Sequence, residues 1–151
     1  MRATIHADPP HGVAALDALE RPGVDPRRVA IAHTDAEIDV TYQTALAERG
    51  AFVECDCIGW EGAARTGADQ GTSADHMRVE VVASLLAAGF GDQLLLSQDV
   101  VTRIQLTAHG GGGYAYLLRD LPPLFEEHGI PRHLLHRLVT DGPARWLAWG
   151  H

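Results

Sequence analysis

The stretch VAIAHTD, residues 29–35, is a short apolar run that leads directly into a histidine, His33. Two other apolar runs have the same form: ATIHAD reaches His6, and LLLSQD ends at Asp99. Runs of this length predict β-strands. In a parallel β/α sheet the loops after the strands all open on one face. We therefore expect the three polar side chains to converge there.

Together with the segments between them, these runs form four strand-plus-helix units, which predict an α/β fold with parallel strands. A further apolar run reaches Asp56 and supplies the remaining strand. The expected strands cover residues 2–6, 29–33, 51–58 and 93–97. The expected helices cover residues 14–19, a segment from about 35 to 49, and residues 73–88.

Capping residues and apolar spacing define two of these helices. Thr34 or Asp35 is expected to cap the second helix, and Gly50 to end it. In the third helix the expected buried stripe contains five apolar residues, which are Met77, Val81, Val82, Leu85 and Leu86. Near the carboxyl terminus, Pro122 and Pro123 predict a helix break. Pro131 and Pro143 are each expected to open a short final helix.

Composition limits the class of protein. The chain has 151 residues, of which 46% are hydrophobic, and this predicts one domain over residues 1–151. A formal charge of −8 without a basic run argues against nucleic acid or an anionic membrane as a partner and favours a small-molecule substrate. Two cysteines, Cys55 and Cys57, are too few for a disulfide framework, so we expect a reducing cytoplasm. No apolar run is long enough to span a membrane.

Two imidazoles and one carboxylate form a ligand set that suits Zn²⁺ or a similar divalent ion. The expected metal ligands are His6, His33 and Asp99. If one coordination position stays open, bound water ionises near neutral pH and provides a hydroxide nucleophile. Asp99 is the expected catalytic base, because a carboxylate beside that water can accept its proton. The expected substrate is an ester, lactone, amide or phosphoester.

Other features have alternative interpretations. A single histidine at a strand end is more often a hydrogen-bonded core or surface residue than a ligand. Cys55 and Cys57 fit a packed strand core better than a thiolate metal site. The loop at residues 59–71 is either a mobile active-site loop or a connector. Gly110–Gly113 could bind phosphate through backbone amides, but these glycines form no complete nucleotide fingerprint, so a flexible loop is the simpler interpretation.

Several motifs in order resemble the phosphotriesterase family, which are metal-dependent hydrolases of the amidohydrolase superfamily that include lactonases. They are TIHA at residues 4–7, DPRRVAIAHTD, ALAERGAFVECDCIG, LLLSQDV, GGGGYAYLLRDLPPLFEEHGI and the final Pro143, Arg145 and Leu147. The resemblance covers nearly the whole chain. It implies the carboxyl half of a TIM (β/α)₈ barrel, with the four strands corresponding to strands five to eight.

The resemblance also implies roles for individual residues. His6 and His33 match the family's metal histidines after strands five and six, and Asp99 matches its strand-eight aspartate. Asp56 and Cys57 fall where some relatives place an aspartate and a histidine near the substrate. Cys57 departs from that pattern, which puts a histidine proton relay in doubt. Trp60, in the loop that follows, is a further candidate for substrate contact.

The family's HxH motif on strand one and its lysine on strand four have no counterpart in the sequence. The complete family site holds two metals, so the resemblance implies a partial site that binds one ion at most. We therefore expect either a hydrolase that needs a homodimer or a complementing chain to close its barrel, or a truncated, catalytically silent half-barrel. An open half-barrel would leave sheet edges and apolar surface exposed. A nucleotide-binding domain is a weaker third hypothesis.

Overall fold

A computed structural model describes residues 2–60 and 75–148 of the chain. It contains one sheet of four parallel strands, in the order in which they occur in the sequence. The strands are β1 (Ala3–His6), β2 (Val29–Ala32), β3 (Phe52–Cys55) and β4 (Leu94–Leu96). All four strands were predicted, but each ends earlier than expected or at the expected ligand. His33, Asp56 and Asp99 therefore lie in the loops just beyond the strands.

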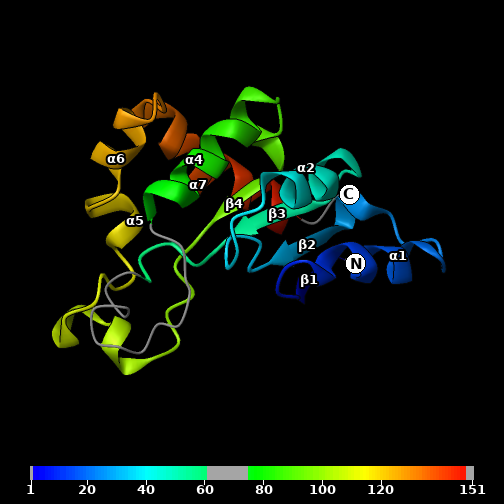
Figure 1. Cartoon of the computed structure of the whole chain (residues 1–151), viewed down its shortest axis with the longest axis horizontal. Coiled ribbons are helices and arrows are strands. Elements are labelled where there is room, and N and C mark those ends of the chain that lie inside the picture. Colours follow the sequence, from blue (N-terminus) through cyan, green and yellow to red (C-terminus); the bar gives the residue numbers. More distant parts are fainter. Residues whose placement is uncertain (1, 61–74, 149–151) are drawn as a thin grey trace.

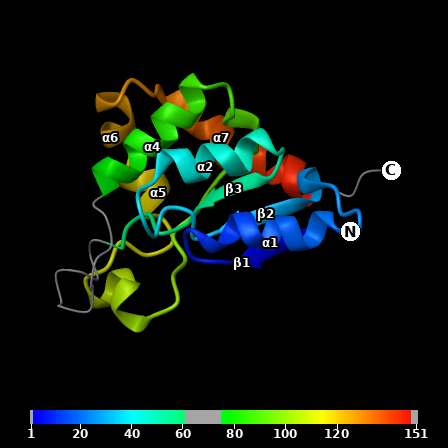
Figure 2. The same cartoon turned by 45° about the vertical axis from the view of Figure 1, so that its right-hand side comes forward.

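Helices alternate with the strands, and α1, α2 and α4 line one face of the sheet (Figures 1 and 2). The helices are α1 (His11–Glu20), α2 (Val40–Glu48), α4 (Asp75–Ala87), α5 (Tyr116–Arg119), α6 (Pro122–Glu127) and α7 (Arg132–Leu147). Short 3₁₀ turns are η1 (Pro26–Arg28), η2 (Gly91–Gln93), η3 (Arg103–Gln105) and η4 (Thr107–His109). The main hydrophobic core lies between the helices and the sheet.

Strand register assigns each side chain to one face of the sheet, because side chains alternate along a strand. Ile31 is paired with Val53, and both belong to the main core under the helices. Ala30 is paired with Phe52, and these two form a second buried cluster with Leu95. Trp146, near the end of α7, packs against that cluster. Trp146 thus covers this cluster on the second, inner face of the sheet.

Helix α2 begins later than the sequence predicted. Thr34 and Asp35 are not its cap, because their side chains bind elsewhere. The Asp39 carboxylate instead accepts hydrogen bonds from the backbone N–H groups of Thr41 and Tyr42. The expected stop at Gly50 is confirmed by its φ of 93°, in the left-handed region that glycine adopts freely.

Helix α4 buries a different residue from the one expected at its start. Met77 is 38% exposed, whereas the Arg78 side chain is completely buried. Val81, Val82 and Leu85 are buried as predicted. Arg78 lies three and four residues before this pair of valines, so it shares their helical face.

The final proline does not open a helix. Pro122 starts α6, which confirms the predicted break, and Pro131 caps α7, which confirms the predicted start. Pro143, however, lies inside α7. Residues 132–147 are therefore one helix rather than parts of two. The expected loop at residues 59–71 lies outside the described residues from residue 61 onward. Within the described ranges, no helix combines the length and the apolar character needed to span a membrane.

Candidate metal centre

His6 and His33 meet at the carboxyl edge of the sheet. His6 is the last residue of β1, and His33 directly follows β2. Nε2 of His33 lies 2.7 Å from Nδ1 of His6, and the two ring centroids are 4.1 Å apart. The convergence of these two side chains, predicted from their positions at strand ends, is therefore observed.

A buried carboxylate fixes the ring of His33. Oδ1 of Asp56 lies 3.0 Å from both the backbone N and the ring Nδ1 of His33. Oδ1 already accepts the backbone N–H of His33, so it also acts as the acceptor for the ring, and Nδ1 carries the proton in this arrangement. Nε2 then presents a lone pair toward His6. Metal-binding histidines are commonly oriented by a carboxylate in this way.

The backbone at two predicted ligands is strained. His33 has φ of 58° and Asp99 has φ of 39°, and they are the two non-glycine residues with positive φ within the described ranges. Such a conformation costs about 1–3 kcal/mol and persists where surrounding contacts enforce it. At His33, the hydrogen bond from its backbone N–H to Asp56 is one such contact. Strain of this kind is concentrated at functional sites.

Burial changes the acidity of groups around the histidines. Burial, together with the charge of Asp35, raises the pKa of Asp56 to about 7. Burial also raises the pKa of Asp35 and of Glu54, with Asp99 adding to the effect on Glu54. The thiol of Cys57 is buried, and its pKa is raised far above the ordinary value. Cys57 is therefore a neutral thiol in the absence of a metal.

Asp99 lies in the loop after β4 and is half-buried. Its backbone carbonyl accepts a hydrogen bond from Gln105, which belongs to η3. Its charge contributes to the raised pKa of Glu54, the third residue of β3, but less than burial and Asp35 do. The role of Asp99 as metal ligand and base stays a prediction.

Asp56 and Trp60, both expected near the substrate, have partners within the chain. Asp56 holds His33, as described above. The indole N–H of Trp60 donates to the carbonyl of Gln98, immediately before Asp99. Cys57 is 1% exposed and its sulfur lies 3.7 Å from Oδ1 of Asp56. Substrate contact by these residues stays a prediction, whereas the interpretation of Cys55 and Cys57 as packed core thiols is confirmed.

The donor atoms offer two ways to hold a metal ion. One uses Nε2 of His33 with Nδ1 of His6; two nitrogen ligands of one tetrahedral zinc are about 3.3 Å apart, so the rings would separate by about half an ångström. The other uses His33, Asp56 and Cys57, whose ligand atoms lie within 4.8 Å of one another. The first fits better, because Asp56 already binds Nδ1 of His33 and Cys57 is protonated.

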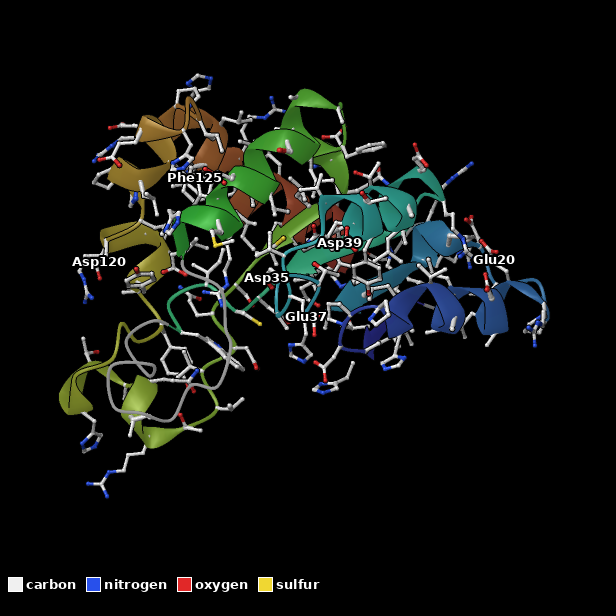
Figure 3. All side chains as sticks on the ribbon, viewed as in Figure 1. Glu20, Asp35, Glu37, Asp39, Asp120 and Phe125 are labelled. Carbon is white, nitrogen blue, oxygen red and sulfur yellow. The ribbon has the colours of Figure 1, made fainter. Side chains whose placement is uncertain are left out.

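The sequence analysis missed Asp75 and Arg78, and it expected Asp35 only as a helix cap, although all three charged residues are buried. Figure 3 shows Asp35 near the middle of the molecule, while Glu20 and Asp120 lie toward opposite ends. A signal for Arg78 existed, since it shares the helical spacing of Val81, Val82 and Leu85. Asp35 follows His33 by two residues, but this position does not show that its carboxylate binds Arg78 and the backbone of Asp56.

Comparison with known proteins identifies the family. The model of the phosphotriesterase family matches residues 2–147. The chain belongs to the phosphotriesterase family. Its four-stranded sheet is half of that family's TIM (β/α)₈ barrel, as the sequence predicted. Members of the family are metal-dependent hydrolases.

Individual relatives place the chain more closely. It is 28% identical to the N-acetyltaurine hydrolase of Dictyostelium discoideum over 134 residues, which are 87% of the chain and 36% of that protein. A resiniferatoxin-binding protein from Rhodobacter sphaeroides has 31% identity and a TM-score of 0.86, and the match covers 100% of the chain and 44% of that structure. A variant PTE-like lactonase from Deinococcus radiodurans has 26% identity and a TM-score of 0.73, over 91% of the chain and 44% of that structure. The chain thus spans less than half the length of each.

Proposed function

We propose that the chain carries one part of the metal centre of a hydrolase that cleaves small esters, lactones or phosphotriesters. One observation carries this proposal: Nε2 of His33 and Nδ1 of His6 converge from two adjacent strand ends. These two nitrogens would hold one divalent ion, for which zinc is the best match to a pair of neutral imidazoles. Asp99, after β4, would serve the neighbouring ion position.

A bound divalent ion supplies Lewis acidity, which polarises the bond to be cleaved and makes water a nucleophile near neutral pH. The residues of the chain supply orientation and proton transfer. Asp56 keeps the proton of His33 on Nδ1, so that Nε2 is available as a ligand. Asp99 would accept the proton of the attacking water, because a carboxylate at that edge is a suitable general base.

The names of relatives support a small-molecule substrate. One relative is an N-acetyltaurine hydrolase and another a PTE-like lactonase. Amide and ester hydrolysis both require water to attack a polarised carbonyl, so the same centre can serve either. The net charge of −8 disfavours polyanionic substrates and is compatible with a small neutral one. The two free cysteines favour a reducing compartment, and we include a cytoplasmic location in the proposal.

A complete site would need a second set of residues. Within the described residues, the expected ligands are His6, His33 and Asp99, which are fewer than two metal ions require. Strand β1 is at the border of the sheet and three of its four residues are exposed. We therefore include in the proposal a second copy, or a complementing chain, that pairs with β1 and closes the barrel.

Zinc binding by the purified chain tests the proposal. Equilibrium dialysis against zinc chloride, followed by metal analysis, is expected to give about one zinc per chain. His6→Ala and His33→Ala should each remove most of that zinc, since two-ligand binding cannot survive the loss of one ligand. The exposed His133→Ala, on α7, is the matched control and should retain it.

A second candidate function is a catalytically silent half-barrel that binds metal weakly or self-associates. It is favoured by one observation: the tight group of possible ligands in the described residues does not include Asp99. Hydrolysis of lactone, aryl ester and phosphotriester substrates with zinc present separates the two candidates. Turnover that depends on His33 supports the hydrolase, whereas zinc binding without any turnover supports the silent form.

A further inference from the structure

Arg78 occupies an unusual place for a guanidinium group. It lies in the first turn of α4, and its side chain has no exposed surface. Nη1 lies 2.9 Å from Oδ1 of Asp75, and Nε lies 3.5 Å from Oδ2 of Asp35. Asp35 belongs to the loop after β2, whereas Asp75 begins α4. The arginine thus joins two carboxylates from separate segments of the chain.

Both carboxylates also hold the backbone that follows β3. Asp35 accepts hydrogen bonds from the N–H of Asp56 at 2.9 Å and of Cys57 at 3.2 Å. Asp75 accepts one from the N–H of Gly59 at 3.0 Å. The segment 56–59 is therefore attached at both ends to the carboxylates that Arg78 connects.

That segment carries the side chain that orients the candidate ligand. Asp56 accepts from the backbone N–H of His33 and fixes its ring at Nδ1. We propose that Arg78 is a positioning residue of the metal centre: by joining Asp35 and Asp75, it holds Asp56 where Asp56 sets the ring orientation and tautomer of His33. This inference rests on the proposed function, because it assigns His33 the role of a ligand.

The burial of Arg78 is difficult to explain by stability alone. Among the described residues, its buried Nε and Nη2 atoms have no hydrogen-bond partner, although Nε is within ion-pair distance of Asp35. Burying charged groups carries a large desolvation penalty, and apolar residues in such places are often equally stable or more stable. A buried arginine with unused donors therefore indicates that its role is to hold its partners in place. Those partners, Asp35 and Asp75, hold the segment that carries Asp56, and Asp56 binds His33.

The apo protein provides a test that does not depend on metal. Long-range ¹H–¹⁵N spectra of the imidazoles report which ring nitrogen carries the proton, and His33 signals can be assigned by their loss in His33→Gln. In the metal-free wild type we expect His33 to be protonated at Nδ1. In Arg78→Met we expect a mixture of tautomers, because Asp56 is no longer held in place. Arg78→Lys keeps the charge but not the fork of donors and should show a smaller change in the same direction.

Zinc affinity, measured by competition with a chromophoric chelator, is the second readout. Loss of a residue that supports a ligand from behind weakens metal binding about 10- to 100-fold, and we expect this for Arg78→Met. Arg49→Met is the matched control, because Arg49 also pairs with two carboxylates, Asp17 and Glu20 of α1, neither of which binds the segment around Asp56 in the described part of the chain. It should lower stability without changing the His33 tautomer or the zinc affinity.

Each outcome has a distinct meaning. Unchanged His33 signals and zinc affinity in a folded Arg78→Met overturn the positioning role. If Arg78→Met does not fold, Arg78→Lys decides in the same way. If the wild type binds no zinc, the proposed function fails, while the tautomer of His33 in the metal-free variants still supports or overturns the role of Arg78.

Discussion

At the scale of single residues, one hydrogen bond determines what His33 can do. With Asp56 on Nδ1, the imidazole offers a lone pair at Nε2, directed toward His6. Without that bond the ring could rotate or exchange its tautomer. The chemistry of the site thus depends on Asp56 as much as on the two histidines.

Burial of Asp56 predicts a dependence of stability on pH. Its ordinary pKa is 3.8, and burial raises the pKa to about 7 in the folded protein. Between these values the folded state binds more protons than the unfolded state, so the free energy of unfolding falls as pH rises from about 4 to about 7. Asp56→Asn removes this contribution, and its unfolding free energy should fall less steeply over the same range.

Urea unfolding of metal-free protein at several pH values measures this difference. The exposed Glu127→Gln is the control and should follow the wild type. Parallel pH profiles of wild type and Asp56→Asn would show that Asp56 is not a buried, shifted carboxyl group. The sign of the difference matters most, since Asp35 and Glu54 also have raised pKa values and contribute in the same direction.

Sequence reasoning reached His6 and His33 because strand ends in a parallel sheet share an edge, and that constraint is independent of detailed packing. It did not predict the buried ion pairs of Arg78 with Asp35 and Asp75. Helical spacing could have placed Arg78 on the buried face, but its pairing with Asp35 joins segments far apart in the chain, which spacing does not show. Asp56 was found, but its contact with His33 depends on the shape of two loops.

At the scale of elements, α7 shows how packing overrides a local signal. A proline usually ends or opens a helix, yet Pro143 lies within a helix that runs to Leu147. Gly142, just before it, is buried against β4. Packing of α7 against β4, and of Trp146 against the inner face, offsets the helix-breaking effect of Pro143. Helix propensity alone could not predict this, because the stabilising contacts are between α7 and the sheet.

Gly142 permits that close approach and provides a prediction. A Cβ atom at this position would lie 2.9 Å from the backbone carbonyl oxygen of Leu94. Overpacking of this kind costs about 1–3 kcal/mol, and the better helix propensity of alanine returns only about 1 kcal/mol. Gly142→Ala should therefore lower the free energy of unfolding by about 1 kcal/mol, as measured by urea titration.

Thr140→Ala is the control for this substitution, since Thr140 is exposed on the same helix. A change within about 0.5 kcal/mol is expected there. Equal or greater stability of Gly142→Ala would mean that α7 does not press on β4 at this residue.

At the scale of the whole molecule, the two faces of the sheet are covered by different elements. Helices cover the main core on one face, whereas Trp146 covers Ala30, Phe52 and Leu95 on the inner face. Arg2, at the start of the chain, lies 5.4 Å from the ring of Trp146. The amino- and carboxyl-terminal segments therefore meet below the inner face, at the opposite end of the strands from His6 and His33.

The two ends of the strands differ in composition. Apolar side chains pack around Trp146 at one end of the inner face, and polar side chains, including His6 and His33, lie at the other end. The parallel direction of the four strands was predictable, because a helix was expected after each apolar run. The cover over the inner face was not predictable, because it depends on the path of α7 relative to the sheet.

X-ray absorption of the zinc-loaded protein shows whether His6 and His33 together bind one metal ion. We expect two imidazole ligands at about 2.0–2.1 Å and no sulfur ligand. His6→Ala should reduce the imidazole count, while Cys57→Ala should leave the spectrum unchanged. A sulfur ligand at about 2.3 Å that is lost in Cys57→Ala would rule out binding by the histidine pair and place the ion with His33, Asp56 and Cys57 instead.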